Sequence, residues 1–119
     1  METNFDKPLE QMLSTKTQDL GSYVVSSLRA NSILKATKSG NMVTLVMKFG
    51  SGPFTEDQVL TDALPEEYRP PIDVYSSASC LNEAMAVIVR TSGIIQTYIV
   101  RGTALQANGG LYASVTYAV

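Results

Sequence analysis

The 119-residue chain carries nine Lys and Arg against eleven Asp and Glu, giving a net charge of −2, and has no histidine. This length is enough for one hydrophobic core but not for two. The cations are scattered, so the chain lacks the basic patch of a nucleic-acid-binding protein. Without histidine, the catalytic triads and imidazole zinc sites of most hydrolases are excluded, and we expect a non-enzymatic protein without cofactor or metal.

Secretion and membrane insertion are also disfavoured. The first residues, Met1 to Asp6, are acidic and polar, unlike the basic start of a secretion signal, so we expect synthesis in the cytoplasm without a signal peptide. The longest apolar run, Ala84 to Val89, is far shorter than the ~20 residues of a membrane-spanning helix. The single cysteine, Cys80, excludes an intrachain disulfide and is expected to be a small buried side chain.

Residues 1–21 differ in pattern from the rest of the chain. Apolar side chains recur there at the spacing of one helix face, at Phe5, Leu9, Met12, Leu13 and Leu20. Asp6 is a suitable N-cap, and Gly21 is a suitable stop. The pattern predicts a short amphipathic helix over residues 6–18 of an N-terminal arm, 1–21; a partly ordered arm is the alternative.

From Tyr23 onward the period changes to two, which predicts an all-β domain over residues 22–119. A first hairpin is expected from Ser32–Lys38 and Met42–Phe49, because Gly40-Asn41 between them is a two-residue turn. The register that follows from this turn consists of the pairs Lys38–Val43, Ala36–Leu45 and Leu34–Met47. It gives the hairpin one apolar face and one largely polar face.

A second hairpin is expected from Ala84–Arg90 and Ile94–Arg101 around Ser92-Gly93. A two-residue turn there gives two faces that are both apolar. One face holds Met85, Val87, Val89, Tyr98 and Val100, and the other holds Ala84, Ala86, Ile88, Ile95, Thr97 and Ile99. A small domain covers one face with its own core, so the second face is either the middle of a sandwich or a subunit contact. We favour the contact, with Ile88, Thr97 and Ile99 at or near it.

Two other segments complete the domain. Gly50–Pro71 holds four of the five prolines and two acidic pairs, and is expected to be mainly loop or edge strand. We interpret its carboxylates as solvated turn residues; a glycosidase pair and a calcium site are the alternatives. After the Asn108-Gly109-Gly110 turn, a last strand is expected with alternating apolar residues at Leu111, Ala113, Val115, Tyr117 and Val119.

The chemistry that remains is recognition by tyrosines and arginines. A shallow polar-aromatic site would stack rings on the apolar faces of sugars and hydrogen-bond their hydroxyls. The candidates are Tyr68, Tyr75, Tyr98, Tyr112, Tyr117, Asn82, Arg69, Arg90 and Arg101. The alternative is that these tyrosines are core residues or cross-strand partners.

Four segments, read in order, form one layout. They are Lys38-Ser39-Gly40-Asn41-Met42-Val43-Thr44-Leu45, Leu64-Pro65-Glu66-Glu67-Tyr68-Arg69-Pro70, the Ser92-Gly93 hairpin and the chain end Val115-Thr116-Tyr117. This layout resembles the C-terminal head domains of tail, baseplate and receptor-binding proteins of phages that infect Gram-positive bacteria. In that family the Leu-Pro-x-x-Tyr-Arg-Pro segment is a structural element, which implies that Tyr68 and Arg69 anchor it here.

The resemblance implies an antiparallel β-barrel or jelly-roll-like sandwich with a short N-terminal helix. It also implies a homotrimeric virion tail protein that meets other tail or baseplate proteins and binds host cell-wall saccharide or teichoic acid. For the ligand we expect Tyr75 and Asn82 to contact sugar, and Arg90 and Arg101 to contact phosphates. The alternatives are a purely structural tail component without ligand, or a C1q-like trimeric recognition module.

Overall fold

The structure is a computed structural model, and it describes residues 15–50, 54–80, 83–99 and 110–119. Seven strands and a few short helical turns make up this part of the chain. The strands are β1 (Thr15–Asp19), β2 (Ile33–Ser39), β3 (Met42–Phe49), β4 (Val74–Cys80), β5 (Glu83–Val89), β6 (Ile95–Ile99) and β7 (Leu111–Ala118). The helical turns are η1 (Gly21–Tyr23), α2 (Ser26–Arg29) and η2 (Glu66–Tyr68). None of the described helices is long and apolar enough to cross a membrane.

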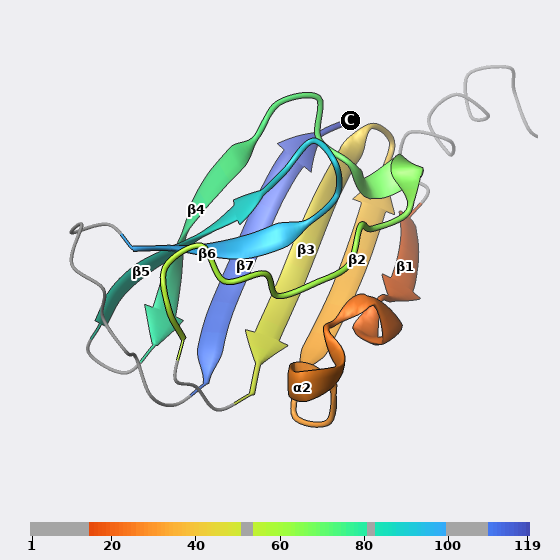
Figure 1. Cartoon of the computed structure of the whole chain (residues 1–119). Coiled ribbons are helices and arrows are strands. Elements are labelled where there is room, and N and C mark those ends of the chain that lie inside the picture. Colours follow the sequence, from red (N-terminus) through yellow and green to blue (C-terminus); the bar gives the residue numbers. More distant parts are fainter. Residues whose placement is uncertain (1–14, 51–53, 81–82, 100–109) are drawn as a thin grey trace, which may run out of the picture.

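All seven strands belong to one open antiparallel sheet in the order β1-β2-β3-β7-β4-β5-β6 (Figure 1). The all-β prediction is therefore confirmed, but the barrel and the two-sheet jelly roll are wrong. The two edge strands, β1 and β6, do not pair with each other. An irregular segment lies next to β6 instead, and it makes only isolated bridges, Val59 with Gln96 and Val24 with Thr61. Single bridges do not form the continuous ladder that closes a barrel.

The core lies between the curved sheet and this irregular segment. In Figure 1, β6 crosses in front of β7, and the green segment leading to η2 crosses in front of β7, β3 and β2. Phe54, Leu60 and Leu64 of the segment are fully buried against the inward side chains of the sheet. Gly50–Pro71 is mainly loop as expected, although it supplies part of the core. Cys80 is fully buried, as predicted.

The chain enters the sheet earlier than its sequence pattern indicates. Residues 15–18, expected at the end of a helix, lie in β1, which pairs with β2 from Thr15 opposite Ser39 to Asp19 opposite Lys35. Leu20, which continues the helical spacing beyond residue 18, is fully buried in the core. Threonine favours strands, and pairing with β2 outweighs the weak preference of a short isolated helix. The rest of the expected helix lies outside the described residues.

The first hairpin and the last strand follow the predicted patterns. The pairs Lys38–Val43, Ala36–Leu45 and Leu34–Met47 are all present in β2 and β3. Gly40 has a φ of 59°, which suits the first central residue of a type II′ turn. In β7, Leu111, Val115 and Tyr117 are buried, and the strand pairs with the whole of β3. Thr15, Ser39, Met42 and Ala118 consequently lie on one rung across β1, β2, β3 and β7.

The second hairpin exists, but its register differs by one residue from the prediction. Val89 pairs with Ile95 and Val87 with Thr97. The connection has three residues, because the Arg90 amide donates to the Ile94 carbonyl and Gly93 takes a φ of 89°. A shift of one residue exchanges the two faces of β6, so Ile95 and Thr97 face the core and Tyr98 faces out.

This shift removes one residue from the expected subunit contact. Thr97 is fully buried, and its hydroxyl donates to the Thr55 carbonyl and accepts from the Gln58 amide at 2.9 Å. Ile88 does lie on the outer side, but it is almost fully buried beside its cross-strand partner Tyr75. The side chain of Ile99 lies outside the described set.

The junction of β7 and β4 is the weakest pairing inside the sheet. The two strands pair only at Ala78 with Ala113 and at Ser79 with Tyr112. Beyond these positions they separate, and the Ser76 hydroxyl donates to the Ser114 carbonyl at 3.3 Å. The sheet therefore consists of two well-paired parts, β1-β2-β3-β7 and β4-β5-β6, joined along a short seam.

Candidate functional site

The four segments that carry the phage-head resemblance meet at one place in the fold. Val43 of β3 lies opposite Tyr117 of β7, and the Tyr117 hydroxyl donates to the backbone carbonyl of Tyr68. The Leu64 amide donates to the Gly93 carbonyl at 3.1 Å. The strand after the first turn, the Leu-Pro-x-x-Tyr-Arg-Pro segment, the second turn and the last strand thus form one packed junction.

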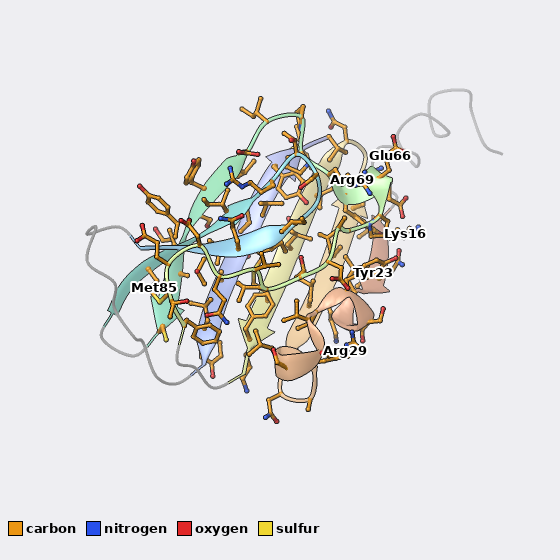
Figure 2. All side chains as sticks on the ribbon, viewed as in Figure 1. Lys16, Tyr23, Arg29, Glu66, Arg69 and Met85 are labelled. Carbon is orange, nitrogen blue, oxygen red and sulfur yellow. The ribbon has the colours of Figure 1, made fainter. Side chains whose placement is uncertain are left out.

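Tyr68 and Arg69 are anchors in this junction, as predicted. Tyr68 is fully buried, and its hydroxyl donates to Oε1 of Gln18 in β1 at 2.8 Å. The Arg69 Nε donates to the Leu64 carbonyl at 2.9 Å. Figure 2 shows Glu66 and Arg69 at η2, close to Lys16 of β1. The Lys16 ammonium forms an exposed ion pair of 3.1 Å with Glu67, so η2 is tied to β1 by two side chains.

Burial raises the pKa of Tyr117 well above its ordinary value. Its hydroxyl therefore stays protonated, and continues to donate to the Tyr68 carbonyl, at alkaline pH where an exposed tyrosine ionises. Tyr68 and Tyr117 are structural residues in this geometry, and neither is presented to a ligand.

Of the four residues predicted to bind ligand, the structure describes Tyr75 and Arg90. Tyr75 in β4 is 59% exposed and packs edge-on against Tyr98 of β6, with ring centroids 5.7 Å apart. Arg90 lies at the end of β5 and is half-buried. Asn82 and Arg101 lie outside the described residues.

Arg90 is engaged with protein groups rather than available to a phosphate. Its Nη1 pairs with Oδ2 of Asp73 at 2.8 Å, and its Nε donates to Gln96 at 3.3 Å. Asp73 also accepts from the Thr91 amide, and the hydrogen bonds from Arg90 and Thr91 lower the pKa of its carboxyl. Asp57 adds a second carboxylate, which accepts from Gln96 at 3.4 Å. The predicted phosphate contact therefore lacks a free positive charge.

The five tyrosines named from the sequence do not form one site. Tyr68 and Tyr117 are in the core, Tyr75 and Tyr98 form a pair over β4 and β6, and Tyr112 lies half-exposed on β7. Tyr75, Tyr98 and Tyr112 share the side of the sheet that faces away from the core, which we call the outer face.

The outer face holds a trough where β4 and β7 separate. It has a volume of about 510 Å³ and is lined by Val46, Met47, Ser77, Ala78, Ser79, Tyr112, Ala113 and Ser114. No charged residue lines it. The exposed hydroxyl-bearing residues Ser77 and Ser79 come from β4, and Val46 on the other side is half-exposed. The trough combines small hydroxyl-bearing side chains with an aromatic ring and an aliphatic side chain.

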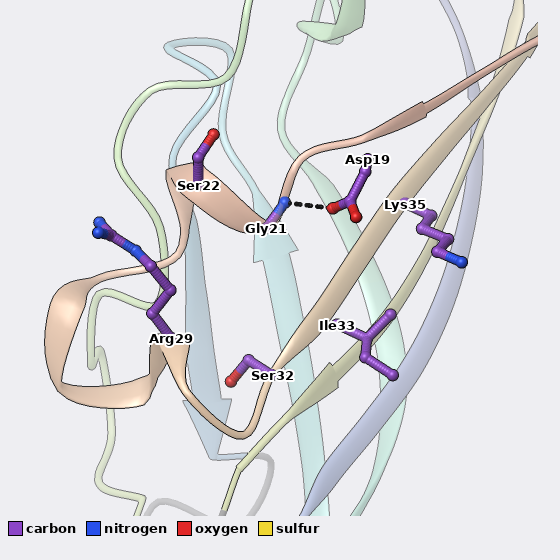
Figure 3. A pocket seen from close by; sticks show the side chains of 7 residues that line it. All are labelled: Asp19, Gly21, Ser22, Arg29, Ser32, Ile33 and Lys35. Atoms are coloured by element: carbon purple, nitrogen blue, oxygen red, sulfur yellow. Dashed lines mark hydrogen bonds between the residues drawn. The ribbon is translucent and has the colours of Figure 1, made fainter.

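A second recess, of about 660 Å³, lies beside η1 and α2 and is lined by Asp19, Gly21, Ser22, Arg29, Ser32, Ile33 and Lys35. Its polar groups do not converge. Figure 3 shows Arg29 and Lys35 pointing in opposite directions, and the Asp19 carboxylate accepts from the Gly21 amide at 2.8 Å. The Arg29 Nε donates to the Val24 carbonyl, and the Ser32 hydroxyl donates to the Leu28 carbonyl. These bonds stabilise the loop and leave few of its polar groups for a ligand.

Reasoning from the sequence missed the trough because serines in a strand carry no strong signal. The available signal was the alternation in Val74–Cys80, where Ser77 and Ser79 occupy the same face as Tyr75. Within the described ranges, no three acidic or cysteine side chains gather where they could hold a metal ion. Comparison of the sequence with protein-family models and with curated proteins finds no match.

Proposed function

We propose that the chain is a non-enzymatic head domain of a phage tail or baseplate that contacts the host surface and binds cell-wall saccharide. In this proposal the head acts as a homotrimer in the virion and attaches to other tail or baseplate proteins. Weak binding by each copy is then strengthened by the simultaneous action of three copies.

The observation that carries the proposal is the junction of the four segments. The pieces that resemble the phage heads are far apart in the sequence, yet they contact one another through Val43, Tyr117, Tyr68, Leu64 and Gly93. The four segments support the relation as one packed unit, although the open sheet differs from the barrel or jelly roll that the resemblance implies. Function follows from this relation only as a proposal, because one fold hosts many functions.

The outer face is the better candidate for the contact with the host. It presents Tyr75, Tyr98 and Tyr112, whereas the opposite side of the sheet is occupied by the core. Tyrosines supply rigid apolar area together with a hydroxyl, which suits recognition of sugars. The pairing of Arg90 with Asp73 favours a neutral saccharide over the phosphates of teichoic acid at this face.

Adsorption to purified cell walls tests the proposal. The intact chain is mixed with walls from a panel of Gram-positive bacteria, and the bound fraction is measured after sedimentation, with light scattering to determine the oligomeric state. We expect a trimer that binds some walls saturably and is displaced by the polysaccharide released from those walls. A chain that binds no wall in the panel contradicts host recognition and favours a structural tail component.

A further inference from the structure

We propose that the trough between β7 and β4 is a subsite for one uncharged sugar ring. The inference rests on the proposed function and adds the place of contact, the residues and the charge of the ligand. The trough was not among the sites expected from the sequence, although Tyr112 was one of the candidate tyrosines, and neither Tyr75 nor Arg90 lines it.

The trough arises from the way the two strands pair. The β4–β7 ladder ends after Ala78–Ala113 and Ser79–Tyr112, and the next contact is the side-chain hydrogen bond from Ser76 to the Ser114 carbonyl. The small side chains at this position leave a hollow of about 510 Å³, within the range of ~300–1,000 Å³ for small-molecule sites. The hollow is therefore lined by residues of three strands, β3, β4 and β7, and by no loop residue.

Hydroxyl groups of the trough are available to a ligand. Ser77, Ser79 and Ser114 make no side-chain hydrogen bond within the described part of the chain, and Ser77 and Ser79 are exposed. A serine hydroxyl both donates and accepts, so three of them match the mixed donors and acceptors of a sugar. Ser77 and Ser79 come from β4 and Ser114 from β7, next to Val46 and Tyr112, which are each about half-exposed and supply the apolar surface for the C–H groups of a ring.

Electrostatics favour a neutral ligand. No cation lines the trough, and the Lys48 ammonium lies over the Tyr112 ring at 5.8 Å from the centroid. That position suits a cation–π contact that orients the ring. A phosphate in the trough would lose its hydration with no cation among the lining residues, and the Lys48 ammonium is already held over the Tyr112 ring.

The test is a titration of the isotope-labelled intact chain, followed by amide NMR shifts. The probes are N-acetylglucosamine, glucose, galactose and rhamnose, with glycerol 3-phosphate as the anionic probe. We expect at least one neutral sugar to shift the amides of Ser77, Ser79, Tyr112 and Ser114 with a Kd on the order of 1 mM, and glycerol 3-phosphate to leave them unchanged.

Variants locate the contact. In Ser77→Val/Ser114→Val two hydroxyls are removed while strand propensity rises, so the fold is retained and sugar affinity should fall at least tenfold. Thr44→Val is the matched control, because Thr44 lies on the same face outside the trough and pairs with Thr116; its affinity should equal that of the parent.

The outcomes separate this inference from the proposed function. If the chain binds walls but the sugars shift only the amides near Tyr75 and Tyr98, or none, the trough is not a subsite. Host recognition is then still supported by the wall binding. Shifts of the trough by glycerol 3-phosphate overturn the neutral charge of the ligand. Absence of binding to every wall and every sugar overturns both proposals.

Discussion

The two hairpins of this protein are of similar length, yet only the first has the register that its sequence predicts. Both contain a glycine with positive φ, Gly40 at 59° and Gly93 at 89°. In the first hairpin, Gly40 and Asn41 form the whole turn, and one face of the strands is clearly polar. In the second, the turn takes an additional residue, Thr91, and both faces are apolar. A polar face excludes a slipped register, and the second hairpin has no such face.

Tertiary contacts decide the register where the strand pattern does not. The second turn is bonded on both sides: Leu64 donates to the Gly93 carbonyl, and Asp73 accepts from the Thr91 amide and from Arg90. Thr97 in turn bonds to residues 55 and 58 of the covering segment. The register of the second hairpin is therefore set by segments distant in sequence.

Substitution of Thr97 by glutamate should have the largest effect. Thr97 is fully buried, so Thr97→Glu places an uncompensated carboxylate in the core and should cost roughly 3–5 kcal/mol or prevent folding. Gln96→Glu, one residue earlier and on the outer face, should cost far less. The measurement is the free energy of unfolding from denaturant titration. If Gln96→Glu were the more damaging of the two, the register described for β6 would be incorrect.

Substitution of each turn glycine by alanine should have an intermediate effect on the free energy of unfolding, and the effect should differ between the two turns. A Cβ at Gly93 would lie 2.7 Å from the Leu64 amide nitrogen and 3.1 Å from Arg69 Cγ, in addition to the strain of a φ of 89°. We expect Gly93→Ala to lower the free energy of unfolding by about 3 kcal/mol, and Gly40→Ala by about 1 kcal/mol. Equal losses in the two variants would show that the contact with Leu64 contributes nothing.

The smallest effect is the pH dependence that Asp73 adds through its bonds to the turn of the second hairpin. The pKa of Asp73 is lowered in the folded chain by Arg90 and by the Thr91 amide, so its carboxylate stabilises the fold above the ordinary Asp pKa of about 3.9. This contribution is lost as pH falls through the lowered pKa of the folded state. Thermal unfolding of Asp73→Asn should therefore change less than that of the parent between neutral and acid pH. Parallel pH profiles would indicate that Asp73 does not support the turn.

The parts of the fold that could be predicted are those that local chemistry decides. Gly40-Asn41 and the alternation of β7 follow the prediction. The anchoring by Tyr68 and Arg69 agrees with what the resemblance implies. The helix predicted over residues 6–18 is wrong for residues 15–18, because they pair with β2 as part of strand β1. Its other residues lie outside the described ranges. The openness of the sheet could not be derived either, since it depends on how Gly50–Pro71 lies beside β6.

For the candidate site, the sequence indicated which residues could bind a ligand, but not which protein groups those residues contact. Tyr75 is exposed as a ligand-binding residue requires, but Arg90 is paired with Asp73, seventeen positions earlier in the chain. The trough results from the separation of β4 and β7, and no property of Ser77 or Ser114 alone reveals that separation. The subsite proposed there depends on strand pairing, which the sequence pattern does not specify.

The rung shared by Thr15 and Ala118 has a consequence for engineering the chain. These residues are separated by three strand spacings, from β1 through β2 and β3 to β7, or about 14 Å at ~4.8 Å per strand. A linker of about five residues would span this distance. A cyclic polypeptide made of residues 15–119 could therefore keep every pairing of the sheet, and its unfolded state would have less conformational entropy than that of the linear chain. Backbone cyclisation is thus a direct route to a more heat-resistant form of the protein.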